Sequence, residues 1–136
     1  ISEIKLALNN LKPVAHRLHL SKVGGKIILD DSFNGNLEGM IEAIAVSSTY
    51  DGRKVIITPG LVESTMESNV KLAKAIDDNF DLVIITGQLN AKLLQKTITK
   101  TKVIMLPNKQ ELEEVLIKHT TIGDLILFAN DAPNFI

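Results

Sequence analysis

The chain has 136 residues, a length that fits one domain with its own hydrophobic core. Its formal net charge is −1, so no overall field favours a nucleic acid or an anionic membrane as a partner. The absence of cysteine excludes disulfides and thiolate metal sites, and no apolar run approaches the roughly 20 residues that a membrane-spanning helix needs.

The N-terminal part is predicted to hold a helix at about Ser2–Asn10 and a strand at about Arg17–Val23. Gly24-Gly25 separates this strand from the next apolar run, a pattern typical of a tight hairpin. We therefore expect the first strand to be antiparallel to the second.

Short apolar runs then recur along the chain, rich in Ile, Val and Leu and without the alternation of a half-exposed strand. Such runs are typical of strands that are buried on both faces of a parallel sheet. They are Lys26–Asp30, Lys54–Thr58, Leu82–Thr86, Lys102–Leu106 and Asp124–Ala129.

Between these runs, apolar residues recur with a helical period at Leu37–Ala45, Met66–Ile76, Leu89–Leu94 and Leu112–His119. The alternation of strand and helix predicts a Rossmann-like three-layer α/β/α fold. Its sheet would be mostly parallel, with about six strands, one of them antiparallel, and right-handed crossovers that place helices on both faces.

Two acidic residues, Asp30 and Asp31, stand where the first long strand ends. Open α/β sheets bind their ligands at this carboxyl edge, where a carboxylate can accept hydrogen bonds from ribose hydroxyls or help to hold a metal. It can equally cap a turn or lie in solvent. Because adjacent strand residues point to opposite faces, we expect the two acids to have different roles.

The segment Asn34-Gly35-Asn36 comes next, directly before a helical pattern. Asn36 is a candidate N-cap, and capping alone would explain it. The same geometry leaves backbone amides at a helix N-terminus, which attract phosphate or carboxylate groups. Both interpretations stay open. His16 is expected to be structural, because no catalytic partner stands near it in the sequence.

Later loops add further candidates at the same edge. Glu63 is the only charged residue in the loop after the second long strand, with Ser64 as a candidate cap for the helix that follows. Asn130 and Asp131 follow the last strand, among residues typical of turns. Each of these could contact a ligand or serve only the turn.

Known nucleotide-binding motifs are missing: the sequence has no G-x-x-x-x-G-K-[ST] and no G-x-G-x-x-G. A phospho-accepting receiver domain would also carry an acid pair after an early strand. It would need an Asp after the third strand and a Lys after the last strand. Ile85-Thr86-Gly87 has no acid and Phe128-Ala129-Asn130 has no Lys, so we reject this interpretation.

Two segments together resemble the C-terminal domain of the Mur ligases, the ATP-dependent amide-forming enzymes of peptidoglycan precursor synthesis. Pro13-Val14-Ala15-His16-Arg17 is similar to the segment of the family that ends in His-Arg. Asp30-Asp31-Ser32-Phe33-Asn34-Gly35-Asn36 is similar to Asp-x-Tyr-Asn-Ala-Asn, with Phe33 where Tyr is usual. This form is typical of MurF, the ligase that adds D-alanyl-D-alanine to UDP-N-acetylmuramoyl-tripeptide.

The resemblance implies roles for individual residues. Arg17 would be the catalytic residue that contacts the ATP phosphates, and Asp31 would bind the ribose of ATP. Asn34 and Asn36 would shape the loop beside the nucleotide. Substrate contacts are implied for Glu63, Asn130 and Asp131, although Pro59–Glu63 keeps only the Glu of the family's Gly-Asp-Met-x-Glu.

The resemblance also implies a larger enzyme. Residues 1–136 would be the C-terminal domain of a three-domain ligase, inactive alone, as a chain that starts at Ile1 rather than Met suggests. The central ATPase domain would hold most of the ATP and the magnesium, with no metal ligand in this chain. The nucleotide-linked peptide would be activated as an acyl phosphate and attacked by the amine of D-alanyl-D-alanine, in the bacterial cytoplasm.

Two alternatives stay open beside this assignment. One is a MurF-like ligase that uses another amine. The other is a stand-alone binding or regulatory module of flavodoxin-like shape, which would bind its ligand without further domains. Calorimetry of the isolated chain with ATP separates the ligase assignment from the stand-alone module. The ligase assignment predicts weak or no binding of ATP to this chain, because most ATP contacts would belong to another domain.

Overall fold

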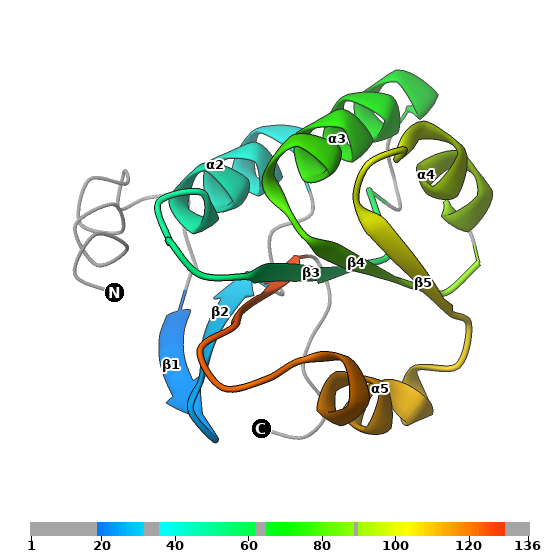
Figure 1. Ribbon diagram of the computed structural model, residues 1–136. Helices are drawn as coiled ribbons and strands as arrows, with labels where there is room; N and C mark the ends of the chain where they lie inside the picture. The colour runs from blue at the N-terminus through cyan, green and yellow to red at the C-terminus, as the bar shows by residue number, and fades with distance from the viewer. Residues whose placement is uncertain (1–18, 32–35, 62–64, 89, 130–136) are drawn as a thin grey trace.

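A six-stranded sheet with helices on both faces makes up the computed structural model, which describes residues 19–31, 36–61, 65–88 and 90–129 (Figure 1). The predicted helix at Ser2–Asn10 lies outside these residues. The strands are β1 (His19–Val23), β2 (Lys26–Asp31), β3 (Lys54–Thr58), β4 (Leu82–Thr86), β5 (Lys102–Leu106) and β6 (Leu125–Ala129). The α-helices are α2 (Leu37–Ser47), α3 (Met66–Asn79), α4 (Ala91–Thr97) and α5 (Leu112–His119), and a short 3₁₀ turn (Lys109–Glu111) precedes α5.

The sheet has the strand order β1-β2-β6-β3-β4-β5, and all its pairs are parallel except β1 with β2. Gly24 and Gly25 join β1 to β2 with φ values of +58° and +81°, which suit a two-residue hairpin. The predicted antiparallel hairpin and the five parallel strands are therefore confirmed.

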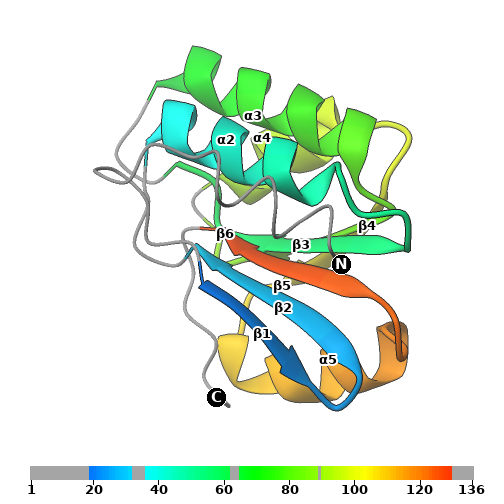
Figure 2. The same cartoon turned by 90° about the vertical axis from the view of Figure 1, so that its left-hand side faces the viewer.

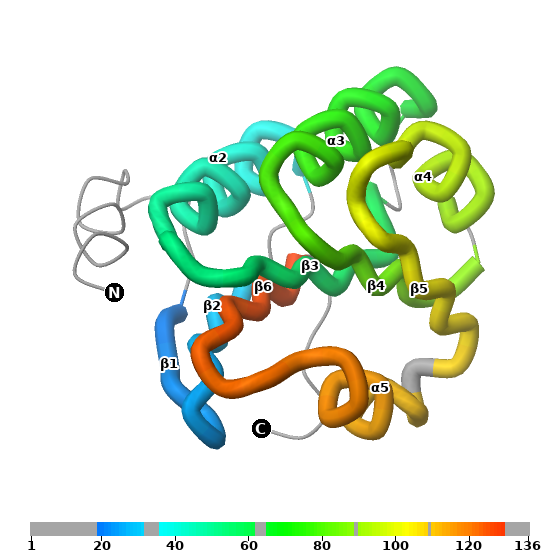
Figure 3. The backbone as a smooth tube through the Cα atoms, viewed as in Figure 1, coloured from blue at the N-terminus to red at the C-terminus, as the bar shows by residue number. Residues whose placement is uncertain are grey.

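The order of the parallel strands differs from that of flavodoxin-like domains. Counted along the chain from β2 to β6, the order across the sheet is 1-5-2-3-4, whereas a flavodoxin-like sheet has 2-1-3-4-5. The last parallel strand, β6, lies between the first two parallel strands, β2 and β3, as the backbone trace shows (Figure 3). The flavodoxin-like shape of the alternative hypothesis is therefore wrong for this chain.

The helices divide unequally between the two faces: α2, α3 and α4 cover one face and α5 covers the other (Figures 1 and 2). Handedness explains this division. The connections from β2 through β5 run in one direction across the sheet, while the connection from β5 to β6 runs back. A right-handed crossover that runs the opposite way must carry its helix on the opposite face.

Both faces of the sheet are packed, which explains why the strands do not alternate. Leu127 contributes to the apolar cluster under α2, α3 and α4, and its neighbour Phe128 contributes to the cluster over α5. Each is 0% exposed, so each contributes roughly 1.5–3 kcal/mol by its removal from water.

An ion pair between Arg53 and Asp124 lies at the amino edge of the sheet, where β3 and β6 begin. Arg53 Nη1 lies 2.8 Å from Asp124 Oδ2 and 2.9 Å from the carbonyl oxygen of His119. The same Asp124 oxygen accepts a hydrogen bond of 2.9 Å from the backbone N–H of Thr121. Because the Asp124 side chain is 4% exposed, these contacts satisfy a buried carboxylate and serve the fold.

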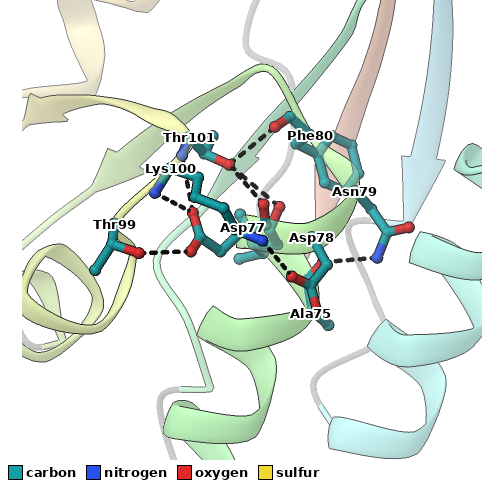
Figure 4. A network of polar contacts seen from close by, with 9 residues as sticks. Ala75, Asp77, Asp78, Asn79, Phe80, Thr99, Lys100 and Thr101 are labelled. Carbon is teal, nitrogen blue, oxygen red and sulfur yellow. Dashed lines mark hydrogen bonds and ion pairs between the residues drawn. The ribbon is translucent and has the colours of Figure 1, made fainter.

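A second polar network ties the end of α3 to the turn before β5 (Figure 4). The Asp77 carboxylate accepts hydrogen bonds from the backbone N–H groups of Lys100 (2.7 Å) and Thr101 (2.8 Å) and from Thr99 Oγ1 (3.1 Å). Partial burial raises the pKa of Asp77, but these hydrogen bonds outweigh burial and lower it to about 2.

Asp77→Asn is expected to lower the free energy of unfolding by about 1 kcal/mol at pH 7, since hydrogen bonds to a charged group are lost at a half-exposed site. A lowered folded-state pKa stabilises the fold above about pH 4, and this stability is lost as the pH falls towards 2. Denaturant unfolding of both proteins from pH 2 to 7 should therefore show the difference shrinking with acid. Asp78→Asn is the control, because among the described residues the Asp78 side chain makes an exposed ion pair with Lys100 and no other polar contact. An equal loss of unfolding free energy in Asp78→Asn would contradict the assignment.

Candidate functional site

The carboxyl edge of the sheet brings together three of the segments in which the sequence predicts function. Asp31 of β2 pairs with Ala129 of β6, and Ile57 pairs with Phe128, so Thr58 of β3 lies beside Ala129 on its other side. Two strand spacings, about 10 Å, separate Asp31 from Thr58. The end of β2 and the turn after β3 thus share one edge, as predicted.

Asp30 and Asp31 point to opposite faces of the sheet. Asp31 is in register with Ala129, which packs under the three helices, while Asp30 is in register with Phe128, which packs over α5. Asp30 is half-buried, whereas Asp31 is 0% exposed. The expected orientation of the two acids to opposite faces is confirmed, and their different roles stay a prediction.

The burial of Asp31 limits what it can bind. Both of its carboxylate oxygens are shielded from solvent. A ribose could therefore reach them only after a local rearrangement. The ribose contact of Asp31 stays a prediction.

Asn36 is the N-cap of α2. Its Oδ1 accepts a hydrogen bond of 2.7 Å from the backbone N–H of Gly39, and Glu38 stands in the first turn, where a negative charge favours the helix. The capping interpretation is confirmed. Asn36 is exposed at the ligand edge, and its predicted place beside the nucleotide stays a prediction.

The turn after β3 is held by two asparagine side chains, which we call the amide clamp (Asn69 and Asn90). Asn69 Oδ1 accepts from Leu61 N (2.8 Å), and its Nδ2 donates to Leu61 O (3.1 Å) and to the carbonyl oxygen of Thr65 (3.2 Å). Asn90 Nδ2 donates to the carbonyl oxygens of Pro59 (3.2 Å) and Leu61 (3.3 Å). The clamp fixes this turn to α3 and α4.

Sequence reasoning missed both residues of the clamp. A signal for Asn69 was present, since it falls on the buried stripe of α3 with Leu72, Ala73 and Ile76 and is itself 2% exposed. A polar residue on such a stripe needs hydrogen-bond partners. Asn90 resembles an ordinary helix cap in sequence and gave no signal.

The cap of α3 also differs from the prediction. Thr65, not Ser64, is the N-cap, and its Oγ1 accepts a hydrogen bond of 3.1 Å from the backbone N–H of Ser68. The helix begins at Met66, so the threonine stands in the position from which a side chain reaches the N–H three residues on.

Other predicted site residues lie outside the described part of the chain: Arg17, Asn34, Glu63, Asn130 and Asp131. Their roles stay predictions. Among the residues that the structure describes, no group of three His, Cys, Asp or Glu side chains is arranged to hold a metal ion. None of the helices there has the length and hydropathy that crossing a bilayer requires.

Known proteins resemble this chain over most of its length. No protein-family model matches it. It is 27% identical over 135 residues to the UDP-N-acetylmuramoyl-tripeptide–D-alanyl-D-alanine ligase of Escherichia coli (strain K12), covering 87% of this chain and 29% of that enzyme. The chain thus spans less than a third of the length of this curated relative.

Solved structures show the same fold. The crystal structure of the MurF ligase from Thermotoga maritima in complex with ADP matches 90% of this chain and 29% of its own chain, with a TM-score of 0.71 at 22% identity. A crystal structure of MurF from Acinetobacter baumannii matches 91% of this chain and 29% of its own, with a TM-score of 0.69 at 20% identity. The predicted resemblance to the C-terminal domain of the Mur ligases, and to MurF in particular, is therefore confirmed in sequence and in fold.

Proposed function

We propose that residues 1–136 form the C-terminal domain of an ATP-dependent amide ligase of peptidoglycan precursor synthesis. The whole enzyme would add D-alanyl-D-alanine to UDP-N-acetylmuramoyl-tripeptide. The observation that carries this proposal is the similarity to the Escherichia coli ligase over 87% of the chain. The fold likeness to a MurF ligase in complex with ADP supports the use of a nucleotide.

The chain would supply one side of a site that other domains complete. Arg17 would contact the ATP phosphates, where a guanidinium binds phosphate oxygens in a bidentate manner. Asp31 would bind the ribose, with Asn34 and Asn36 shaping the loop beside the nucleotide. Glu63, Asn130 and Asp131 would contact the substrates.

The remaining parts of the reaction belong to the rest of the enzyme. The central ATPase domain of the same chain would hold most of the ATP and the magnesium. ATP supplies the phosphoryl group that activates the peptide carboxylate, and the amine of the dipeptide then forms the amide bond, with release of ADP and phosphate. This domain alone would be inactive.

The full-length protein is expected to consume ATP only when UDP-N-acetylmuramoyl-tripeptide and D-alanyl-D-alanine are both present. The physical reason is that the phosphoryl group of ATP needs the peptide carboxylate as its acceptor, and the acyl phosphate that forms turns over only when the amine attacks it and phosphate leaves. A coupled assay for ADP, with each substrate omitted in turn, measures this.

Two results would change the assignment. Turnover with a different amine, and none with D-alanyl-D-alanine, would keep the ligase class and refute the MurF specificity. Tight binding of ATP to the isolated 136-residue chain, without turnover in the full-length protein, would refute the ligase and favour a stand-alone binding module.

A further inference from the structure

A groove lies between α5 and the β1–β2 hairpin, on the face of the sheet that α5 alone covers among the described helices (Figure 2). Ile28, Leu116 and Ile126 form its apolar floor, since each lines the groove and is at most 4% exposed. The groove encloses about 210 Å³. Because a cavity of roughly 150 Å³ already holds a benzene molecule, this groove has room for the end of an apolar side chain.

Exposed apolar side chains gather around this groove. Among the described residues, five large apolar side chains are exposed, and three of them are Val23, Ile117 and Ile122. Val23 and Ile117 line the groove, and Ile122 lies against the hairpin, since a Cβ built on Gly25 would be 3.0 Å from its Cγ2. Single exposed apolar residues are ordinary, but a group of them around an apolar groove marks an interaction surface.

The position of Ile117 on α5 shows that the fold of this chain does not bury it. Leu112 and Leu116 pack against the sheet and are 1% and 4% exposed. Glu113 and Ile117 each follow by one residue, share the next face of the helix and line the groove. Ile117 is 68% exposed, so most of its apolar surface would leave water only on contact with a partner.

One basic and one acidic side chain stand on the two walls of the groove. Lys26 begins β2 on the hairpin side, and Glu113 belongs to the first turn of α5 on the other side. Within the described part of the chain, neither of them takes part in an ion pair. The groove therefore offers a partner one cation and one anion, on opposite sides of an apolar floor.

We propose that this surface joins two copies of the chain in a two-fold dimer. A two-fold contact needs a self-complementary surface, because each residue meets its counterpart in both directions. This surface is self-complementary in two ways. The groove stands beside projecting isoleucines that fit the groove of a second copy, and Lys26 stands opposite Glu113, the residue with which it would pair across the dimer. A partner of another kind would need the groove alone, so the combination favours a second copy.

The dimer surface lies away from the candidate site. Val23, Gly24 and Lys26 stand at the amino edge of the sheet, where β2 begins, whereas Asp31 ends β2 at the carboxyl edge. Dimerisation thus leaves the carboxyl edge open, and the inference does not depend on the proposed function. Because few residues line the groove, the contact belongs to the small, transient class of interfaces, with a dissociation constant on the order of 10–100 µM.

Sedimentation equilibrium of the full-length protein between about 1 and 300 µM tests the dimer, since the weight-average mass should rise from that of one chain towards that of two. Ile117→Asp should raise the dissociation constant at least about tenfold, because it brings a carboxylate to an apolar groove. The thermal midpoint of this variant should stay within about 2 °C of the wild type, since the Ile117 side chain is largely exposed in the single chain.

Met66→Asp is the matched control. Met66 is 71% exposed and is the first residue of α3, which covers the opposite face of the sheet. The same change of charge at this distant position should leave the dissociation constant within about twofold of the wild type. Equal weakening of the dimer by Met66→Asp and Ile117→Asp would overturn the proposal, because it would show an effect of net charge and not of the groove.

Reversal of the two charges tests the two-fold symmetry. Lys26→Glu alone, or Glu113→Lys alone, places like charges against each other at both symmetry-related pairs, so each should raise the dissociation constant at least about tenfold. An equimolar mixture of the two variants restores opposite charges at both pairs. The mixture should therefore associate with a dissociation constant within about threefold of the wild type.

Two further results would overturn the proposal. A full-length protein that stays monomeric at about 300 µM would do so, as would be seen if another part of the enzyme or another kind of partner filled the groove. A dimer whose charge-reversal variants do not recover on mixing would place the contact elsewhere. None of these measurements uses turnover, so failure of the ligase assignment would leave their outcome unchanged.

Discussion

Arg17→Ala is expected to reduce the turnover of the full-length protein by about 10²-fold or more. Under the proposed function, this guanidinium stabilises charge on the ATP phosphates, and the loss of one such preorganised donor costs about 10²–10³ in kcat. The free energy of unfolding should change by less than about 0.5 kcal/mol, because in this role the guanidinium serves the nucleotide and not the fold. Steady-state kinetics and thermal unfolding measure the two effects separately.

The other arginine of the chain provides the control, since Arg17 and Arg53 are the only two. Arg53→Ala leaves the buried Asp124 carboxylate without its cation and should lower the free energy of unfolding by roughly 2 kcal/mol. This is less than the roughly 3–5 kcal/mol of a fully buried pair, because the Arg53 side chain is 39% exposed. Its turnover should equal that of the wild type. A wild-type rate in Arg17→Ala would refute the phosphate role.

Gly60→Ala is expected to destabilise the fold by about 2–5 kcal/mol. A positive φ costs an L-residue about 1–2 kcal/mol, and overpacking adds about 1–3 kcal/mol. The new Cβ would lie 2.9 Å from Asn69 Oδ1, an atom that hydrogen bonds hold in place on a buried side chain. Chemical denaturation of the 136-residue chain measures the change.

Gly87→Ala separates the cost of a positive φ from the cost of overpacking. Gly87 has φ +72°, close to that of Gly60, but a Cβ added there would meet no atom within 4 Å. Its loss should be limited to the backbone term of about 1–2 kcal/mol. An equal loss of unfolding free energy in Gly60→Ala and Gly87→Ala would show that the amide clamp does not pack tightly against the turn.

The sequence predicted the elements well because the signals for them are local. Strands buried on both faces produce unbroken apolar runs, and Gly24-Gly25 marks a hairpin that the φ values confirm. Asn36 was predicted as a cap from its place before an apolar stripe, and it caps α2.

The features that were missed depend on contacts between distant segments. No local pattern indicates that β6 lies between β2 and β3, because that pairing joins residues about 70 to 100 positions apart. The same holds for Asn90, whose partners Pro59 and Leu61 are 31 and 29 positions away. The burial of Asp31 likewise follows from the packing of the whole edge, so its sequence neighbours could not reveal it.

The position of β6 has a consequence for how this domain folds during its synthesis. Of the six strands, β6 leaves the ribosome last, yet it fills the middle of the sheet. Until it arrives, β2 and β3 each present a bare edge, and the β1–β2 hairpin has no sheet to join. Cooperative folding must therefore wait for the synthesis of residues 125–129, and the long-range pairing makes this step slow. A nascent chain stalled before Leu125 would be an open, aggregation-prone intermediate rather than a slightly shortened domain.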